Sequence, residues 1–185
     1  MRKILIVVDM QNDFVTGSLG TPEAQAIVPR VVEKVKEFAD KDYEIIFTRD
    51  VHYSNYLEGT LEGKYLPIEH CIDATPGYYV IPELDELHML YSKDAFKSTF
   101  GYNDWHNKLQ LRKRWTSLLN YNHIQFEIVG LCTDICVISN ALILRTEFPD
   151  CEIIVHADCC AGTTPEKHAA ALEVMKSCQI LIKGE

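Results

Sequence analysis

The fold is decided by the stretch Gly130-Leu131-Cys132-Thr133-Asp134-Ile135-Cys136-Val137, which follows the apolar run 124–129. A short apolar run bounded by polar residues and glycine predicts a buried strand. Thr133 or Asp134 then supplies the side-chain oxygen that favours a helix start, and the apolar residues 135–144 predict the helix itself. The stretch therefore predicts a strand, a tight turn and a helix, with Cys136 in the first helical turn.

Cys136 is a candidate nucleophile because of that position. A thiol in the first turn faces the positive end of the helix dipole, which favours the thiolate. Unpaired backbone N–H groups at the same place are suited to hold an oxyanion. The alternative is a small buried hydrophobic side chain, which is the common role of a free cysteine. This stretch alone leaves both interpretations open.

The rest of the chain alternates strands with helices. The patterns predict strands at 3–8, 43–48, 88–92, 124–129, 152–156 and 179–183, and helices at 21–38, 105–119, 134–147 and 163–177. Such alternation predicts an α/β fold, with a mostly parallel sheet between helix layers and right-handed crossovers. The length of 185 residues suits one domain, 1–185, with a long loop at about 49–82 that is expected to be functional.

Composition and charge argue against several classes of protein. The net charge of −9 argues against a nucleic-acid-binding surface and against an anionic membrane surface. The N-terminal apolar run is too short for a signal peptide, and no stretch is long and apolar enough to span a bilayer. The seven cysteines include no C-x-x-C pair, so reduced thiols in a cytoplasmic protein are expected.

Chemically active side chains follow several predicted strands. Asp9, Asp50, Lys93 and the turn 132–136 each come after a strand, and the carboxyl ends of parallel strands share one rim of a sheet. A cysteine nucleophile needs a proton acceptor and a charge that favours the thiolate, and Asp9 and Lys93 are the candidates. Taken singly, Asp9 is also explained as a turn residue and Lys93 as a solvated charge.

The long loop contains a candidate metal site. Asp50 and His52 are two residues apart, so in an extended segment their side chains point the same way. His70 can return as a third ligand, and the loop holds glutamates for a fourth. One carboxylate and two imidazoles suit zinc, iron or manganese. The alternative is a polar loop with hydrogen-bonded histidines.

Three motifs together resemble the isochorismatase-like cysteine hydrolases. Asp9-Met10-Gln11-Asn12-Asp13-Phe14 resembles the D-x-Q-x-D-F opening of that family, and residues 130–137 resemble its nucleophile turn. Lys93, in the segment 93–100, resembles its triad lysine. The resemblance covers essentially the whole chain. It implies a three-layer α/β/α fold with a six-stranded sheet, a triad of Asp9, Lys93 and Cys136, and a cis peptide before Cys132. It also implies an oxyanion hole made by the N–H groups of Cys132 and Cys136.

Asp50-x-His52 with His70 resembles the metal site of one branch of that family, the nicotinamidases or pyrazinamidases. Glu62 is the best match to a loop glutamate that completes the site in some relatives. The resemblance implies one divalent ion, zinc with manganese or iron as alternatives, that binds the ring nitrogen of nicotinamide. It implies hydrolysis of nicotinamide and pyrazinamide through a Cys136 thioester, giving nicotinate and ammonia in NAD salvage.

The chain departs from that branch near the third ligand. Residues 66–70 read Leu-Pro-Ile-Glu-His, one residue longer than the usual Trp-Pro-x-His and without the tryptophan. Tyr65 is a candidate substitute for the missing ring-stacking wall, and the residue before the nucleophile is Ile135. The expected substrate pocket comprises Phe14, Tyr65, Phe100, Leu131 and Ile135.

Three other functions remain as alternatives. The nearest is a metal-free amidase or isochorismatase of the same family acting on another small substrate. The others are a catalytically silent binding protein and a flavodoxin-like phosphoryl acceptor using Asp9. The expected partner is a small-molecule substrate, and the sequence leaves open whether the protein is a homo-oligomer.

Overall fold

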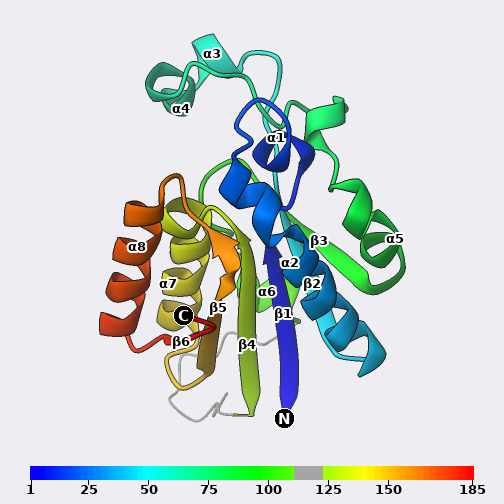
Figure 1. Ribbon diagram of the computed structural model, residues 1–185, viewed down its shortest axis with the longest axis vertical. Coiled ribbons are helices and arrows are strands. Elements are labelled where there is room, and N and C mark those ends of the chain that lie inside the picture. Colours follow the sequence, from blue (N-terminus) through cyan, green and yellow to red (C-terminus); the bar gives the residue numbers. More distant parts are fainter. Residues whose placement is uncertain (111–122) are drawn as a thin grey trace.

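The computed structural model describes residues 1–110 and 123–185, and its centre is one parallel sheet (Figure 1). The six strands lie in the order β3-β2-β1-β4-β5-β6, and every neighbouring pair is parallel. The predicted six-stranded α/β architecture is therefore confirmed. The strands are β1 Arg2–Val8, β2 Glu44–Asp50, β3 Ser92–Lys97, β4 Ile124–Leu131, β5 Glu152–Ala161 and β6 Leu181–Lys183.

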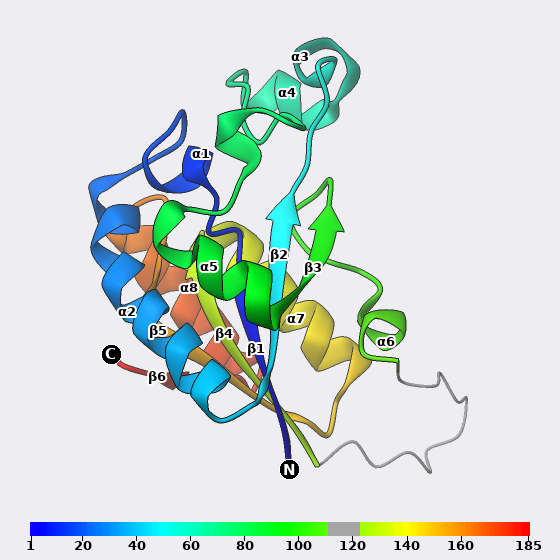
Figure 2. The ribbon, with the colours of Figure 1, turned by 90° about the vertical axis from the view of Figure 1, so that its right-hand side faces the viewer.

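Helices cover both faces of the sheet (Figure 2). One face packs on α2 (Pro22–Asp40) and α5 (Pro82–Tyr91), and the other on α6 (Trp105–Lys108), α7 (Ile138–Glu147) and α8 (Pro165–Ser177). The central strand β1 shows why: its residues from Ile4 to Val8 are all buried and alternate between the two apolar cores. A central parallel strand is covered on both faces and is therefore apolar throughout.

The start of α2 follows the predicted capping pattern. The Thr21 side chain accepts a hydrogen bond of 3.0 Å from the backbone N–H of Ala24, and Pro22 occupies the first helical position. Proline is tolerated there because its missing N–H would have no partner in the helix. The apolar stripe from Ala24 to Phe38 is buried against the sheet, as the spacing predicts.

The edge of the sheet differs from the prediction. The segment expected as a strand at 88–92 forms the end of α5, which begins at Pro82, and β3 begins only at Ser92. The strand therefore ends at Lys97, four residues beyond Lys93. Helix α6 begins at Trp105 as predicted but ends at Lys108, and residues 111–119 of the predicted helix lie outside the described residues.

The carboxyl ends of the strands share one rim, and the chain beyond β2 projects above it (Figures 1 and 2). That projecting segment carries two short helices, α3 (Tyr56–Gly59) and α4 (Leu61–Tyr65), followed by a 3-10 turn at Pro76–Tyr78. In the described part of the chain, no helix has the length and apolarity needed to cross a membrane.

Close approach of two strands at the rim requires a glycine. Gly130 in β4 pairs with Val8 in β1 and has a φ of +115°, a conformation that side chains with a Cβ rarely adopt. A Cβ at Gly130 would lie 2.1 Å from the backbone oxygen of Val8. Both the backbone conformation and the available space therefore exclude a larger residue immediately before the nucleophile turn.

We expect Gly130→Ala to lower the free energy of unfolding by more than about 1 kcal/mol, because alanine is strained at a positive φ and here also meets rigid backbone. Thermal unfolding followed by circular dichroism measures the effect. Gly59→Ala is the matched control, since its new Cβ would meet the movable side chain of Asn55. Equal melting temperatures for the two variants would contradict the strain argument.

Candidate active site and metal centre

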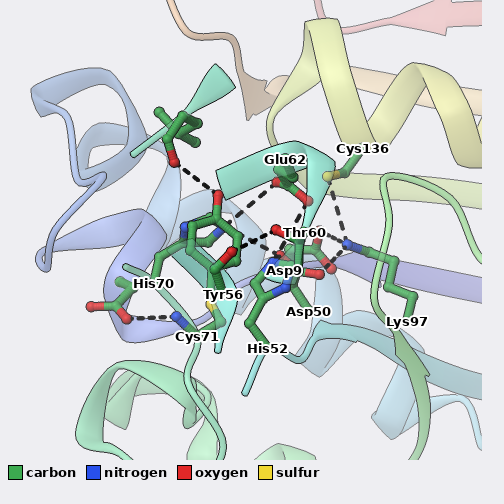
Figure 3. Close-up of polar contacts among 12 residues, drawn as sticks. Asp9, Asp50, His52, Tyr56, Thr60, Glu62, His70, Cys71, Lys97 and Cys136 are labelled. Atoms are coloured by element: carbon green, nitrogen blue, oxygen red, sulfur yellow. Dashed lines mark hydrogen bonds and ion pairs between the residues drawn. The ribbon is translucent and has the colours of Figure 1, made fainter. Parts of the chain in front are cut away.

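Asp9, Lys97 and Cys136 meet at the carboxyl rim of the sheet (Figure 3). The Lys97 ammonium lies 2.7 Å from Asp9 Oδ2 and 3.7 Å from Cys136 Sγ. All three residues are buried. Asp9 directly follows β1, Lys97 ends β3, and Cys136 lies in a turn of π-helix, Thr133–Val137, that follows β4. The structure thus brings a thiol, a carboxylate and an ammonium group into direct contact.

Lys93, the lysine predicted for this group, lies elsewhere. Its side chain is 58% exposed and lies 3.5 Å from Glu44 at the start of β2. Lys93 and Lys97 are four residues apart in one strand, so they lie on the same face but about 13 Å apart along it. The prediction was wrong because it ended the strand too early. Pro82 with acidic residues in the turn after it is a helix-start signal that would have moved β3 to its correct place.

Asp9 is suited to accept a proton. Its Oδ1 accepts a hydrogen bond of 2.7 Å from the Thr48 hydroxyl, and Oδ2 faces Lys97. Burial raises the pKa of Asp9, and the charge of Lys97 opposes that effect. Burial acts to lower the pKa of Lys97, but the charges of Asp9 and Asp50 outweigh burial and hold it well above its usual value. Lys97 therefore stays an ammonium ion beside the carboxylate.

Cys136 rests as a thiol rather than a thiolate. Burial raises the pKa of Cys136 well above its ordinary value, and the nearby Lys97 charge offsets this only in part. Cys136 was predicted to lie in the first turn of an α-helix, but it lies in a π-helical turn and α7 begins only at Ile138. The proton of Cys136 must therefore be taken up by a neighbouring base when the thiol reacts.

The turn that carries Cys136 is anchored on both sides. Thr133 Oγ1 lies 2.8 Å from His168 Nδ1 in α8, and the Asn140 amide donates to the carbonyl of Cys136 at 2.8 Å. Asp134 accepts hydrogen bonds from the N–H and the hydroxyl of Thr163 at 2.8 and 2.6 Å. The peptide bond between Leu131 and Cys132 is cis, as the resemblance implies. These contacts fix the position of the thiol relative to Asp9 and Lys97.

A second cluster lies beside the first (Figure 3). Asp50, His52, Glu62 and His70 each place one ligand-type atom within 4.8 Å of the others. Asp50 Oδ2 is 3.0 Å from Nε2 of His52 and 3.5 Å from Nε2 of His70. Glu62 lies 3.8 Å from Nε2 of each histidine. The four residues predicted as metal ligands are therefore close together and face one another.

The residues of this cluster fit a divalent metal ion. Two imidazole nitrogens and two carboxylates form a donor set that zinc, manganese and iron accept. Asp50 Oδ1 pairs with the Lys97 ammonium at 3.5 Å, while Oδ2 faces both imidazoles. His70 Nδ1 lies 2.9 Å from the carbonyl of Ile68, which leaves Nε2 directed into the cluster. Burial and the neighbouring Asp50 raise the pKa of Glu62, and a bound cation would offset that charge repulsion.

The segment after β1 also positions the metal cluster, which sequence reasoning missed. The Gln11 side chain donates to the carbonyl of Asp50 at 2.9 Å and accepts from its N–H at 2.7 Å. Asp13 Oδ2 accepts a hydrogen bond of 2.8 Å from the N–H of Cys71, next to His70. Backbone groups on both sides of the cluster are thus held by the same segment that carries Asp9. Their spacing in the motif at 9–14 was visible, but their partners depend on the tertiary fold.

One cavity joins the two clusters. Its volume is about 910 Å³, and its wall includes the Asp9 and Cys136 side chains as well as the four candidate metal ligands. Tyr65 is 85% exposed, so it stands at the mouth of the cavity rather than forming a closed wall. The apolar residues expected in the pocket line this cavity: Phe14, Tyr65, Phe100, Leu131 and Ile135.

Comparison with known proteins identifies the family. Residues 3–185 match the model of the isochorismatase domain. A nicotinamidase/pyrazinamidase from Mycobacterium tuberculosis is 28% identical, and the match covers 96% of each chain.

Two solved structures share the fold along nearly the whole chain. The crystal structure of a nicotinamidase from Bacillus subtilis matches with a TM-score of 0.82 at 25% sequence identity, and the match covers 99% of each chain. A pyrazinamidase from Pyrococcus horikoshii, solved in complex with zinc, has a TM-score of 0.78 at 28% identity over 98% of both chains. On the family match over residues 3–185, this chain belongs to the isochorismatase family of hydrolases.

Proposed function

We propose that this enzyme hydrolyses nicotinamide to nicotinate and ammonia, and that it accepts pyrazinamide as well. The observation that carries the proposal is a single cavity lined by Cys136, Asp9 and the four candidate metal ligands, with Lys97 in contact with both Cys136 and Asp9. The thiol supplies a nucleophile, and the cluster supplies a place to hold a ring near it. Relatives named nicotinamidase or pyrazinamidase support the same substrate class. The product nicotinate would enter NAD salvage in the cytoplasm.

The reaction begins with formation of the nucleophile. Asp9 takes the proton of Cys136, and the Lys97 ammonium stabilises the thiolate as it forms. The sulfur attacks the carboxamide carbon and makes a C–S bond, while the carbonyl oxygen takes up negative charge. The backbone N–H groups of Cys132 and Cys136 are the proposed donors to that oxyanion.

The second half of the reaction releases ammonia and then nicotinate. Asp9 gives its proton to the departing nitrogen, so the C–N bond breaks and ammonia leaves a Cys136 thioester. Asp9 then takes a proton from a water molecule, whose oxygen attacks the thioester carbon. The C–S bond breaks, nicotinate leaves, and the proton returns to the Cys136 sulfur.

The metal site serves orientation. Asp50, His52, Glu62 and His70 are the proposed ligands, with zinc the first choice and manganese or iron the alternatives. When bound there, a divalent ion would supply Lewis-acid binding of the ring nitrogen of the substrate, and the four residues that hold it would thereby orient the carboxamide. The nucleophile is made by Asp9, Lys97 and Cys136, so the two clusters have separate tasks.

We expect Cys136→Ala to lower ammonia release from nicotinamide by about 10³-fold or more, because the attacking sulfur is lost. Cys136→Ser is also expected to be very poor, because Asp9 is too weak a base to activate an alcohol. An ammonia-release assay with nicotinamide, pyrazinamide and an aliphatic amide measures both the activity and its selectivity. Cys178→Ala, at the end of α8, is the matched control. Activity of Cys136→Ala within tenfold of the parent would disprove the nucleophile.

Replacing Lys97 should slow alkylation of Cys136 by iodoacetamide at neutral pH. Loss of the ammonium raises the thiol pKa, and each unit reduces the thiolate fraction tenfold, so we expect about tenfold or more for Lys97→Met. Lys93→Met is the matched control from the same strand. Mass spectrometry of the peptide that contains Cys136 distinguishes it from the other cysteines.

Lys97→Met also leaves Asp9 buried without its cation, which costs about 3–5 kcal/mol where a buried pair is broken. Lys97→Arg keeps the charge and is the charge-preserving control. Equal alkylation rates for the Lys97 and Lys93 variants would show that Lys97 does not act on the thiol.

Removing the metal should lower nicotinamide hydrolysis by about 10²-fold, since a misplacement of about 1 Å costs that much. Chelation and dialysis, followed by addition of Zn²⁺, Mn²⁺ or Fe²⁺, measures the loss and its recovery. Benzamide, which lacks the ring nitrogen, should be a far poorer substrate than nicotinamide. If metal-free protein, verified by elemental analysis, is as fast as the holoprotein, the enzyme is a metal-free amidase of the same family.

A further inference from the structure

Tyr56 is buried in a segment that is otherwise open to solvent. Its side chain is 0% exposed, whereas its neighbours Asn55 and Leu57 are exposed. It begins α3, a helix of four residues, which is too short to be stable alone. The position of this segment above the rim must therefore come from contacts to the rest of the protein.

The Tyr56 ring packs on both imidazoles of the metal cluster (Figure 3). The ring centroids lie 4.6 Å from His52 and 5.0 Å from His70, and the two histidines are 4.8 Å from each other. Three aromatic rings in mutual contact restrict one another, and tilted or edge contacts of this kind are favourable. Tyr56 is therefore fixed relative to two of the candidate ligands.

Polar groups of Tyr56 hold both ends of α4, the helix that carries Glu62. The Tyr56 hydroxyl donates to the carbonyl of Leu66, the C-cap of α4, at 3.0 Å. The Tyr56 carbonyl accepts a hydrogen bond of 2.8 Å from the hydroxyl of Thr60, the N-cap. Thr60 Oγ1 in turn accepts from the N–H of Gly63 at 2.9 Å. Tyr56 thus contacts both cap residues of α4, Thr60 and Leu66.

Helix α4 also rests directly on the backbone of Tyr56. A Cβ at Gly63 would lie 2.2 Å from the Tyr56 carbonyl oxygen, so only glycine permits this approach. Leu61 and Tyr65 of the same helix are 70% and 85% exposed, so burial of their side chains contributes little to holding it. The contacts with Tyr56 are the main ones that orient this five-residue helix.

We propose that Tyr56 is a positioning residue that holds Glu62 in the metal site by fixing α4 against His52 and His70. The inference rests on the proposed metal-dependent function. Because α4 is held in this way, Glu62 lies 3.8 Å from each imidazole. Asp50, His52 and His70 come from other segments. Tyr56 therefore decides whether the site has three protein ligands or four.

The test is metal affinity rather than turnover. Tyr56→Phe removes the hydrogen bond to Leu66 and keeps the ring on the imidazoles. The dissociation constant for Zn²⁺ is measured on metal-free protein by competition with a chromophoric chelator. We expect binding to weaken about 10- to 100-fold, as is typical when a residue that orients a ligand is changed. Tyr91→Phe removes an exposed hydroxyl at the end of α5 and is the control, expected within about twofold of the parent.

A double-mutant cycle separates positioning of Glu62 from a general effect on the site. If Tyr56 acts through Glu62, Tyr56→Phe should change Zn²⁺ affinity by less than about twofold in a Glu62→Gln background. Gly63→Ala, which moves α4 off the Tyr56 carbonyl, should weaken binding and show the same loss of effect with Glu62→Gln. The proposal is overturned if Tyr56→Phe and Gly63→Ala weaken Zn²⁺ binding by the same factors in the Glu62→Gln background as in the parent. It is also overturned if Tyr56→Phe binds Zn²⁺ as tightly as the parent. Melting temperatures of the metal-free variants verify that each is folded.

The outcome is independent of the substrate assignment. Weakened Zn²⁺ binding with the predicted coupling supports the role of Tyr56 even if nicotinamide is not hydrolysed. A parent protein that binds no Zn²⁺ overturns the proposal. Failure of the substrate and failure of the positioning role are therefore distinguished by separate measurements.

Discussion

The buried ammonium of Lys97 is the interaction on which the site depends. It lies 2.7 Å from Asp9, 3.5 Å from Asp50 and 3.7 Å from Cys136. Two carboxylates this close together and this deeply buried would repel each other and lose their hydration. A cation between them offsets both costs, so Asp9, the proposed proton acceptor, and Asp50, a proposed metal ligand, can share one rim.

The pairing of the strands places these groups at one rim of the sheet. Asp50 and Lys97 are direct neighbours in the pairing of β2 with β3, and Val8, just before Asp9, pairs with Thr48 in β2. Parallel strands end on the same side of a sheet, so consecutive strands bring their last residues together. The register of the central sheet therefore fixes the distances in the site.

Much of this arrangement was predictable from periodicity. Continuous apolar runs identify β1, β2 and β4 because buried parallel strands need apolar residues on both faces. The rim follows from topology, and so does the meeting of Asp9, Asp50 and the Cys136 turn. The edge strand β3 was misplaced because Ser92–Lys97 is polar and largely unburied, so it has no apolar run to mark it. Lys93 was chosen over Lys97 for that reason.

Other features were beyond the sequence because their partners lie far along the chain. Gln11 binds the backbone of Asp50, and nothing in the local pattern near either residue reveals that pairing. In the sequence Tyr56 is one of several aromatic residues in a loop, and only the structure shows its ring in contact with His52 and His70. Contacts that join segments distant in sequence become visible only when the sheet has placed those segments.

The resting state of Cys136 follows from the same burial that assembles the site. A thiol whose pKa is raised by burial is mostly protonated, so it is a weak nucleophile towards molecules that do not bind the cavity. Asp9, whose pKa burial also raises, is a correspondingly stronger proton acceptor than an exposed aspartate. Burial therefore raises the pKa of both the proposed proton acceptor and the thiol. In the proposed mechanism Lys97 then stabilises whichever partner carries the negative charge, so the reaction needs no permanent thiolate.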